Sequence, residues 1–230
     1  MRQRRYKLQI TSSNKEMIYS TLHSKDTNED PKTSSIIGGL LLLPDQIFYK
    51  VVNRACANIL PLNNGSILSF EFWPHLPADN TSNTNFVEPD VVIHCEYRDI
   101  IIEAKYSETN GQYREQWKNE IIAYKNLYGN KKEVTFIALG GNENYDIEEV
   151  NGVKVLKCSW TSLLMSVISV KSQLEKISYM DEHIAQTMRI IKFIEKSFEV
   201  HQVYSLSILD NIALTRFHSY SDKLLLKFLI

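Results

Sequence analysis

The chain has 230 residues, 43% hydrophobic and 23% charged, with a formal net charge of −1 at pH 7. This composition is ordinary for a globular protein, and the near-neutral balance excludes a strongly basic nucleic-acid-coating protein but leaves room for a local basic groove. Three cysteines without a C-x-x-C pair exclude a disulfide framework and a cysteine zinc site. The basic start lacks an apolar signal region, and no apolar stretch is long enough to span a bilayer, so we expect a cytoplasmic protein that does not insert into membranes.

The N-terminal part, residues 1–35, is polar and predicts a short helix over 15–23 and an exposed loop over 24–35. Pro44 followed by Asp45 is typical of a helix start, and helical spacing continues to residue 60. The later elements follow from alternation or helical spacing. We predict strands over 66–73, 90–97, 100–106, 133–141 and 153–160, a helix over 112–129 that ends at Gly129, a helix from 161, and only helices from Lys171 onward.

This order predicts an α/β fold in which helices flank a mixed β-sheet. We expect three parts: the polar N-terminal segment 1–35, a core over 36–170, and a helical C-terminal extension over 171–230. One apolar stripe of the extension and the apolar tail "LLLKFLI" predict either packing onto the core or a dimer surface. The stripe consists of Ile184, Met188, Ile191 and Phe198.

Three charged residues stand out in the predicted hairpin. Asp90 opens its first strand directly after Pro89, and Glu103 and Lys105 lie two residues apart on its second strand. The period of two in a strand places Glu103 and Lys105 on one face, and antiparallel pairing can bring Asp90 to the same edge. Neighbouring carboxylates repel each other, so a cation must compensate them. Mg²⁺ prefers one or two carboxylates together with water and phosphate oxygens, and it activates water for phosphodiester hydrolysis.

These residues resemble the active-site motif of the PD-(D/E)XK nuclease superfamily, which has a restriction-endonuclease-like fold. Pro89-Asp90 and Glu103-Ala104-Lys105 carry the resemblance, and the predicted helix with Gln112, Gln116, Glu120 and Tyr124 on one face follows at once. The resemblance implies a metal-dependent nuclease that hydrolyses DNA with Mg²⁺ or Mn²⁺. It also implies metal ligation by Asp90, Glu103 and the backbone carbonyl of Ala104, a water-activating Lys105, and a supporting glutamine, for which Gln116 is favoured.

Members of the superfamily often carry a further acid upstream. The candidates here are Glu16, Asp45 and Glu71, and we favour Glu71 because it lies on a predicted strand. A second acid-X-Lys triplet, at residues 30–32, falls in the predicted polar loop and is set aside.

Several alternatives stay open at this point. Glu103 and Lys105 can instead form a surface ion pair, the fold can be an interaction or DNA-binding subunit that assembles through its C-terminal helices, and the same site can cut RNA. By analogy with the superfamily, we expect a role in restriction, phage defence or DNA repair, as a homodimer or as a subunit of a larger assembly.

Overall fold

The computed structural model describes residues 29–61, 63–177 and 182–205, so the helix expected over 15–23 lies outside the described residues. The described elements are helices and strands of an α/β protein, in which single helices or helix pairs separate groups of strands. They are α2 (Glu29–Leu40), α3 (Asp45–Ala55), β1 (Ile67–Phe72), β2 (Leu76–Pro77), β3 (Phe86–Val87), β4 (Val91–Cys95), β5 (Arg98–Ala104), α4 (Arg114–Tyr128), β6 (Glu133–Leu139), β7 (Glu148–Val150), β8 (Val153–Cys158), α5 (Trp160–Ile177) and α6 (Glu182–Val200).

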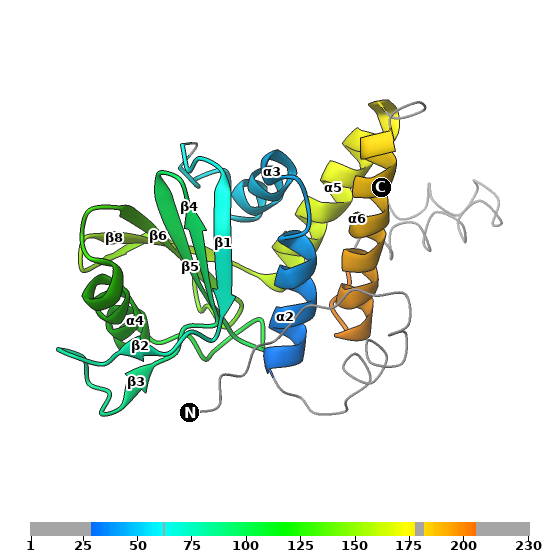
Figure 1. Cartoon of the computed structure of the whole chain (residues 1–230). Coiled ribbons are helices and arrows are strands. Elements are labelled where there is room, and N and C mark those ends of the chain that lie inside the picture. The colour runs from blue at the N-terminus through cyan, green and yellow to red at the C-terminus, as the bar shows by residue number, and fades with distance from the viewer. Residues whose placement is uncertain (1–28, 62, 178–181, 206–230) are drawn as a thin grey trace, which may run out of the picture.

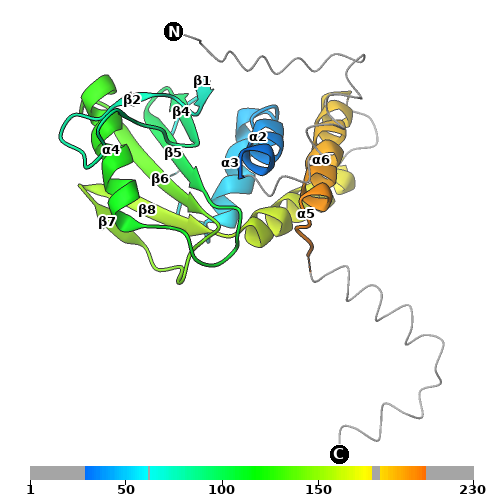
Figure 2. The same cartoon turned by 90° about the horizontal axis from the view of Figure 1, so that it is seen from below.

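The main sheet has six strands in the order β1-β4-β5-β6-β8-β7, and β2 and β3 pair separately. The β5–β6 and β6–β8 pairs are parallel, whereas β1–β4, β4–β5 and β7–β8 are antiparallel. Helix α4 covers one face of the sheet, and α2, α3, α5 and α6 lie on the other (Figures 1 and 2). The predicted mixed α/β sheet flanked by helices is therefore confirmed.

Alternation along the central strands divides the core into two layers. Ile100 and Ile102 of β5 pack with the four-helix side, and Ile101 packs with the α4 side. Because both faces are covered, every residue of β5 after Arg98 is buried, including its two acids. A charge on this strand must therefore find its compensation inside the protein.

The exposed loop expected over 24–35 is wrong from Glu29 onward, where α2 begins. Proline is tolerated in the first turn of a helix, so Pro31 does not prevent this start. The polar sequence nevertheless buries Lys32 and Thr33, which are 3% and 0% exposed. Close packing of α2 against α6, where Gly39 leaves no room for a side chain beside Ile194, outweighs the local preference for a loop.

The C-terminal helices pack against the rest of their own chain. Ile191 and Phe198 of α6 are fully buried in the core cluster, and Met188 packs against that cluster. Among the described residues, this part of the stripe is thus core and does not form a dimer surface. The tail "LLLKFLI" lies outside the described residues.

Candidate active site

The register of the β4–β5 hairpin brings Asp90 and Glu103 together. Val91 pairs with Ile102, so the next residues outward, Asp90 and Glu103, lie across from each other on the α4 face. Both are buried, with 6% and 2% exposure. The Oδ2 atom of Asp90 accepts a hydrogen bond of 2.7 Å from the backbone N–H of Ala104, which fixes the acid at the end of β5.

Lys105 and Gln116 both contact the carboxylate of Glu103. The Lys105 ammonium forms an ion pair with Glu103 Oε1, as expected for residues on one face of a strand. Gln116, in the first turns of α4, donates from Nε2 to the same Oε1 at 2.6 Å. Since Glu103 is buried, the alternative of an exposed surface ion pair is wrong.

Gln112 occupies a different place from the one expected. It precedes α4 and so does not share a helical face with Gln116. Its Nε2 donates to the backbone carbonyl of Glu103 at 2.9 Å, and its Oε1 accepts from Trp117 Nε1 at 2.6 Å. Gln112 therefore holds the strand that carries Glu103, and Trp117 is a core residue with 4% exposure.

Backbone contacts fix the position of Lys105. Its N–H donates to the Leu139 carbonyl at 2.8 Å, and its own carbonyl accepts from Trp160 Nε1 at 2.7 Å. Gly141 has a left-handed φ of +64°, and a Cβ there would lie 2.8 Å from the Cβ and Cγ of Lys105. The glycine-rich loop that follows β6 is therefore shaped to the lysine.

Glu120 is the acid that sequence reasoning missed. It lies one helical turn after Gln116, is 1% exposed, and its Oε2 has no hydrogen-bond partner among the described residues. Burial first, and then the charges of Glu103 and Asp90, raise the pKa of Glu120 well above its usual range. The spacing of four from Gln116 placed Glu120 on the correct helical face but gave it no role.

This donor set suits a hard divalent cation. Among the described residues, no three His, Cys, Asp or Glu side chains are arranged as a ready metal site. However, one or two carboxylates with a carbonyl and waters are enough for Mg²⁺. In an extended strand the carbonyl of a residue lies on the same edge as its N–H, so the Ala104 carbonyl points toward Asp90. A cation there would also offset the crowding of Asp90, Glu103 and Glu120.

Two further contacts support Asp90 from Trp73, the residue that follows β1. The backbone N–H of Trp73 donates to the Asp90 carbonyl at 3.0 Å, and Trp73 Nε1 donates to Asp90 Oδ1 at 3.1 Å. The tryptophan therefore orients the acid.

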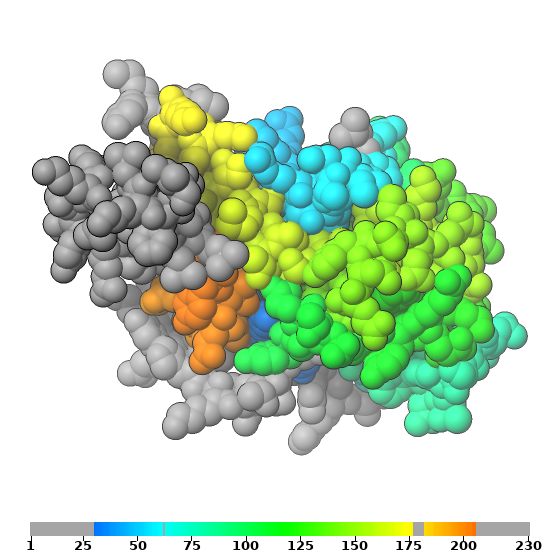
Figure 3. Space-filling model, turned by 180° about the vertical axis from the view of Figure 1, so that it is seen from behind, coloured from blue at the N-terminus to red at the C-terminus, as the bar shows by residue number. Residues whose placement is uncertain are grey.

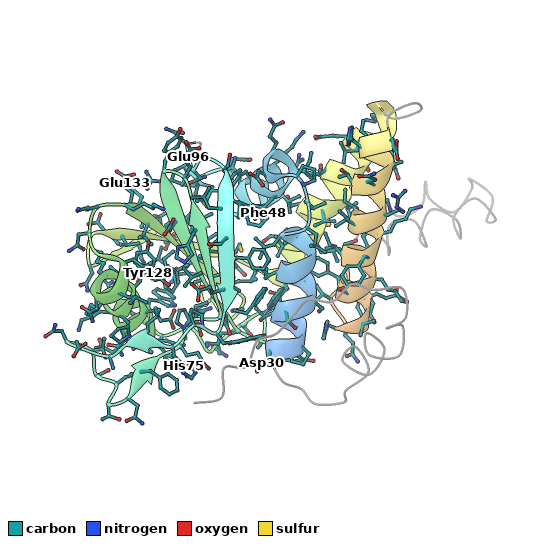
Figure 4. The ribbon with its side chains drawn as sticks, viewed as in Figure 1. Asp30, Phe48, His75, Glu96, Tyr128 and Glu133 are labelled. Atoms are coloured by element: carbon teal, nitrogen blue, oxygen red, sulfur yellow. The ribbon has the colours of Figure 1, made fainter. Side chains whose placement is uncertain are left out.

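The structure does not bring the expected upstream acids to this group. Glu71 accepts from Tyr128 at 3.1 Å and contacts His94 at 3.3 Å, in a second polar cluster on the same face of the sheet. Tyr128, at the C-terminal end of α4, is labelled in Figure 4. Asp45 accepts from the backbone N–H of Ile67 at 3.0 Å, and Glu16 lies outside the described residues.

Asp99 is the centre of this second cluster and is well compensated. Its carboxylate contacts His94 Nδ1 at 2.8 Å and Lys132 Nζ at 3.0 Å. Hydrogen bonds from His94, Tyr124, Cys95 and Lys132 outweigh burial and lower the pKa of Asp99 to about 2. The same bond to Asp99 raises the pKa of His94. The cluster is a closed network, unlike the group around Glu103.

No family model matches the chain. It is 33% identical over 128 residues to "Uncharacterized protein PM0110" of Pasteurella multocida (strain Pm70), a match that covers 55% of this chain and 47% of the relative. The chain therefore spans about half the length of this curated relative.

Among solved structures, the chain is similar to the small subunit (R.BspD6I2) of the heterodimeric restriction endonuclease R.BspD6I. The TM-score is 0.35 and the identity 12%, over 81% of this chain and 97% of that one. A likeness at this level does not establish a shared fold. Separately, no helix among the described residues is long and apolar enough to cross a membrane.

Proposed function

We propose that the chain is a metal-dependent nuclease of the PD-(D/E)XK type, with a restriction-endonuclease-like core, that hydrolyses phosphodiester bonds in DNA. One observation carries the proposal: Asp90, Glu103 and Lys105 meet on one face at the end of a hairpin, and Gln116 of the following helix binds Glu103. The sequence order and the spatial arrangement both correspond to the superfamily motif.

In this proposal, Asp90, Glu103 and the Ala104 carbonyl hold Mg²⁺ or Mn²⁺. The bound ion would polarise the phosphodiester and lower the pKa of a coordinated water. Lys105, next to Glu103, orients the attacking water and stabilises the negative charge that develops on the phosphate. Gln116 holds the carboxylate of Glu103 in one orientation.

Glu120 places a third carboxyl in the same group from α4, and burial together with Glu103 and Asp90 raises its pKa. A cation at this group would favour the ionised form of Glu120 and would offset the repulsion among the three acids. We therefore place Glu120 with the residues that hold the metal or its waters, in the position for which the sequence favoured Glu71.

A wider role follows only by analogy. We propose that the nuclease acts in the cytoplasm in restriction, phage defence or DNA repair, as a homodimer or as a subunit of a larger assembly. RNA is the alternative substrate, since the chemistry of the site is the same for both polymers. An interaction module without activity is the alternative from another class.

The test is cleavage by the purified full chain. Linear and circular DNA, single- and double-stranded, and RNA are incubated with Mg²⁺, Mn²⁺ or EDTA. Glu103→Gln and Lys105→Met should each abolish metal-dependent cutting, whereas Glu115→Gln, on the exposed face of α4, should cut like the wild type.

Three results would contradict the proposal. Cutting that survives Glu103→Gln and Lys105→Met would place the activity elsewhere. Cutting that persists in EDTA would exclude the metal. A folded wild type that cuts no substrate would favour the interaction module.

A further inference from the structure

A cavity of about 410 Å³ adjoins the candidate active site. Gln116 and Glu120 of α4 form one wall, and Asn83, Phe86 and Glu88 form the other. Gln116 is also the residue that binds Glu103, so whatever occupies the cavity lies directly beside the proposed catalytic group. The volume is within the range of small-molecule binding pockets.

The outer wall belongs to the β2–β3 hairpin, which is fixed to α4. Asn119 Oδ1 accepts from the backbone N–H of Ser82 at 3.2 Å, and Asn119 Nδ2 donates to Ser82 Oγ at 2.7 Å. Leu76 and Val87 of the two strands are buried against α4. In Figure 3 the hairpin segment, in turquoise, forms the lower right corner of the molecule. The wall is therefore held in place while its outer side stays exposed.

An exposed aromatic stack lies on this wall. Phe86 is 42% exposed, and its ring stacks on His75 with centroids 4.0 Å apart and planes at 14°. His75 contacts Glu88 at 2.5 Å, which holds the imidazole against the ring. His75 lies at the opposite end of the sheet from Glu96 and Glu133 (Figure 4).

The chemistry of the lining favours a base over a phosphate. The ionisable residues that line the cavity are the acids Glu88 and Glu120, and none of its described lining residues is a lysine or arginine that could bind a phosphate. Aromatic rings bind nucleobases by stacking, and amide and carboxylate groups hydrogen-bond base edges. A base inside a duplex is stacked on its neighbours, so only an unpaired base can enter.

We propose that this cavity binds an unpaired nucleobase of single-stranded DNA, on the nucleotide next to the phosphate at the active site, through contact with Phe86. The inference rests on the proposed function and gives its substrate form: a strand with at least one unpaired base at the cut. The β2–β3 hairpin is the part of the chain that selects this form.

The experiment measures binding separately from cleavage. A fluorescein-labelled single strand of about 12 nucleotides, within the usual site sizes of single-strand binders, is titrated with the full chain in Ca²⁺ and in EDTA, and anisotropy gives the Kd. Phe86→Ala should weaken binding by about five- to 100-fold, the effect of losing one base-stacking contact. Phe86→Trp should bind like the wild type.

Phe70→Ala is the matched control. Phe70 is 37% exposed on β1 and contacts the Phe72 ring on the other face of the sheet from α4. Its replacement should change the Kd by less than twofold. The same DNA annealed to its complement should bind wild type and Phe86→Ala with equal affinity, because its bases are paired.

Equal binding of the single strand by wild type and Phe86→Ala would overturn the inference, as would an equal loss in Phe70→Ala. Failure of the inference is distinguishable from failure of the proposed function. A wild type that cuts DNA while Phe86→Ala binds normally refutes only the base site. A wild type that never cuts, but binds single strands through Phe86, refutes only the nuclease.

Discussion

Replacing Asp99 by asparagine tests how the second polar cluster stabilises the fold. Asp99 Oδ1 accepts from Cys95 N at 2.9 Å and Lys132 Nζ at 3.0 Å, and Oδ2 binds His94 Nδ1 at 2.8 Å and Tyr124 OH at 2.5 Å. These contacts join β4, β5, α4 and the start of β6. The asparagine keeps the shape of the side chain but removes the charge that all four partners use.

The size of the effect follows from the pKa. Lowering the pKa of Asp99 from 3.8 to about 2 corresponds to about 2.4 kcal/mol of folding free energy when the group is ionised in both states. Because the folded pKa is the lower one, this stability is present above pH 3.8 and is lost as the pH falls through about 2. Asp99→Asn also leaves Lys132 without its buried counter-ion, so we expect a total loss of about 3 kcal/mol at neutral pH.

Urea unfolding followed by tryptophan fluorescence measures this loss. Stability is compared at about pH 5 and about pH 3, both below the range in which His94 titrates. The difference in free energy of unfolding between wild type and Asp99→Asn should be smaller by about 1 kcal/mol at the lower pH. Asp146→Asn, an exposed acid, should keep the wild-type stability at both pH values. A gap that stays constant or widens at the lower pH would refute the assigned role of the Asp99 charge.

Three further predictions concern stability. The raised pKa of His94 gives stability that is fully present below its usual pKa of 6.5 and is lost as the pH rises through the folded pKa. In urea titrations above pH 6.5, the free energy of unfolding should therefore fall less with pH in His94→Gln than in the wild type. Lys32→Met removes a buried ammonium that binds a main-chain carbonyl and two aromatic rings; its urea midpoint should fall by the equivalent of about 1–3 kcal/mol, and an unchanged midpoint would contradict this. Gly141→Ala forces a Cβ against Lys105, so its melting temperature should fall further than that of Gly152→Ala, which has the same backbone strain but open space.

The hairpin and its charged face could be predicted because the signal is local. The strand period of two in β5 places Glu103 and Lys105 on one face, the face that α4 covers. The helix after the hairpin follows from its spacing and from Gly129, which ends it as expected. These features depend on near neighbours in sequence.

The features that the sequence did not predict depend on contacts between distant segments. Strands β2 and β3 have two residues each, too few to show a period, and they form because Leu76 and Val87 pack against α4. The register of β1 against β4 pairs Glu71 with Val92, which directs Glu71 to the second cluster. The long loop between these strands leaves that register open in the sequence.

The two polar clusters on the α4 face differ in charge balance. This difference is our reason for giving the Asp99 cluster a structural role and for proposing the Glu103 group as the active site. Around Asp99, a lysine, a histidine and neutral donors compensate the buried acid, whose pKa falls, and the second acid of this cluster, Glu71, is half exposed. Around Glu103, three acids share Lys105 and Gln116, and the pKa of Glu120 rises. A fold selected only for stability would not retain such a buried excess of acid, since it costs free energy. A bound cation would remove that cost, which is the physical reason why we propose the metal at this end of the sheet and not at the other.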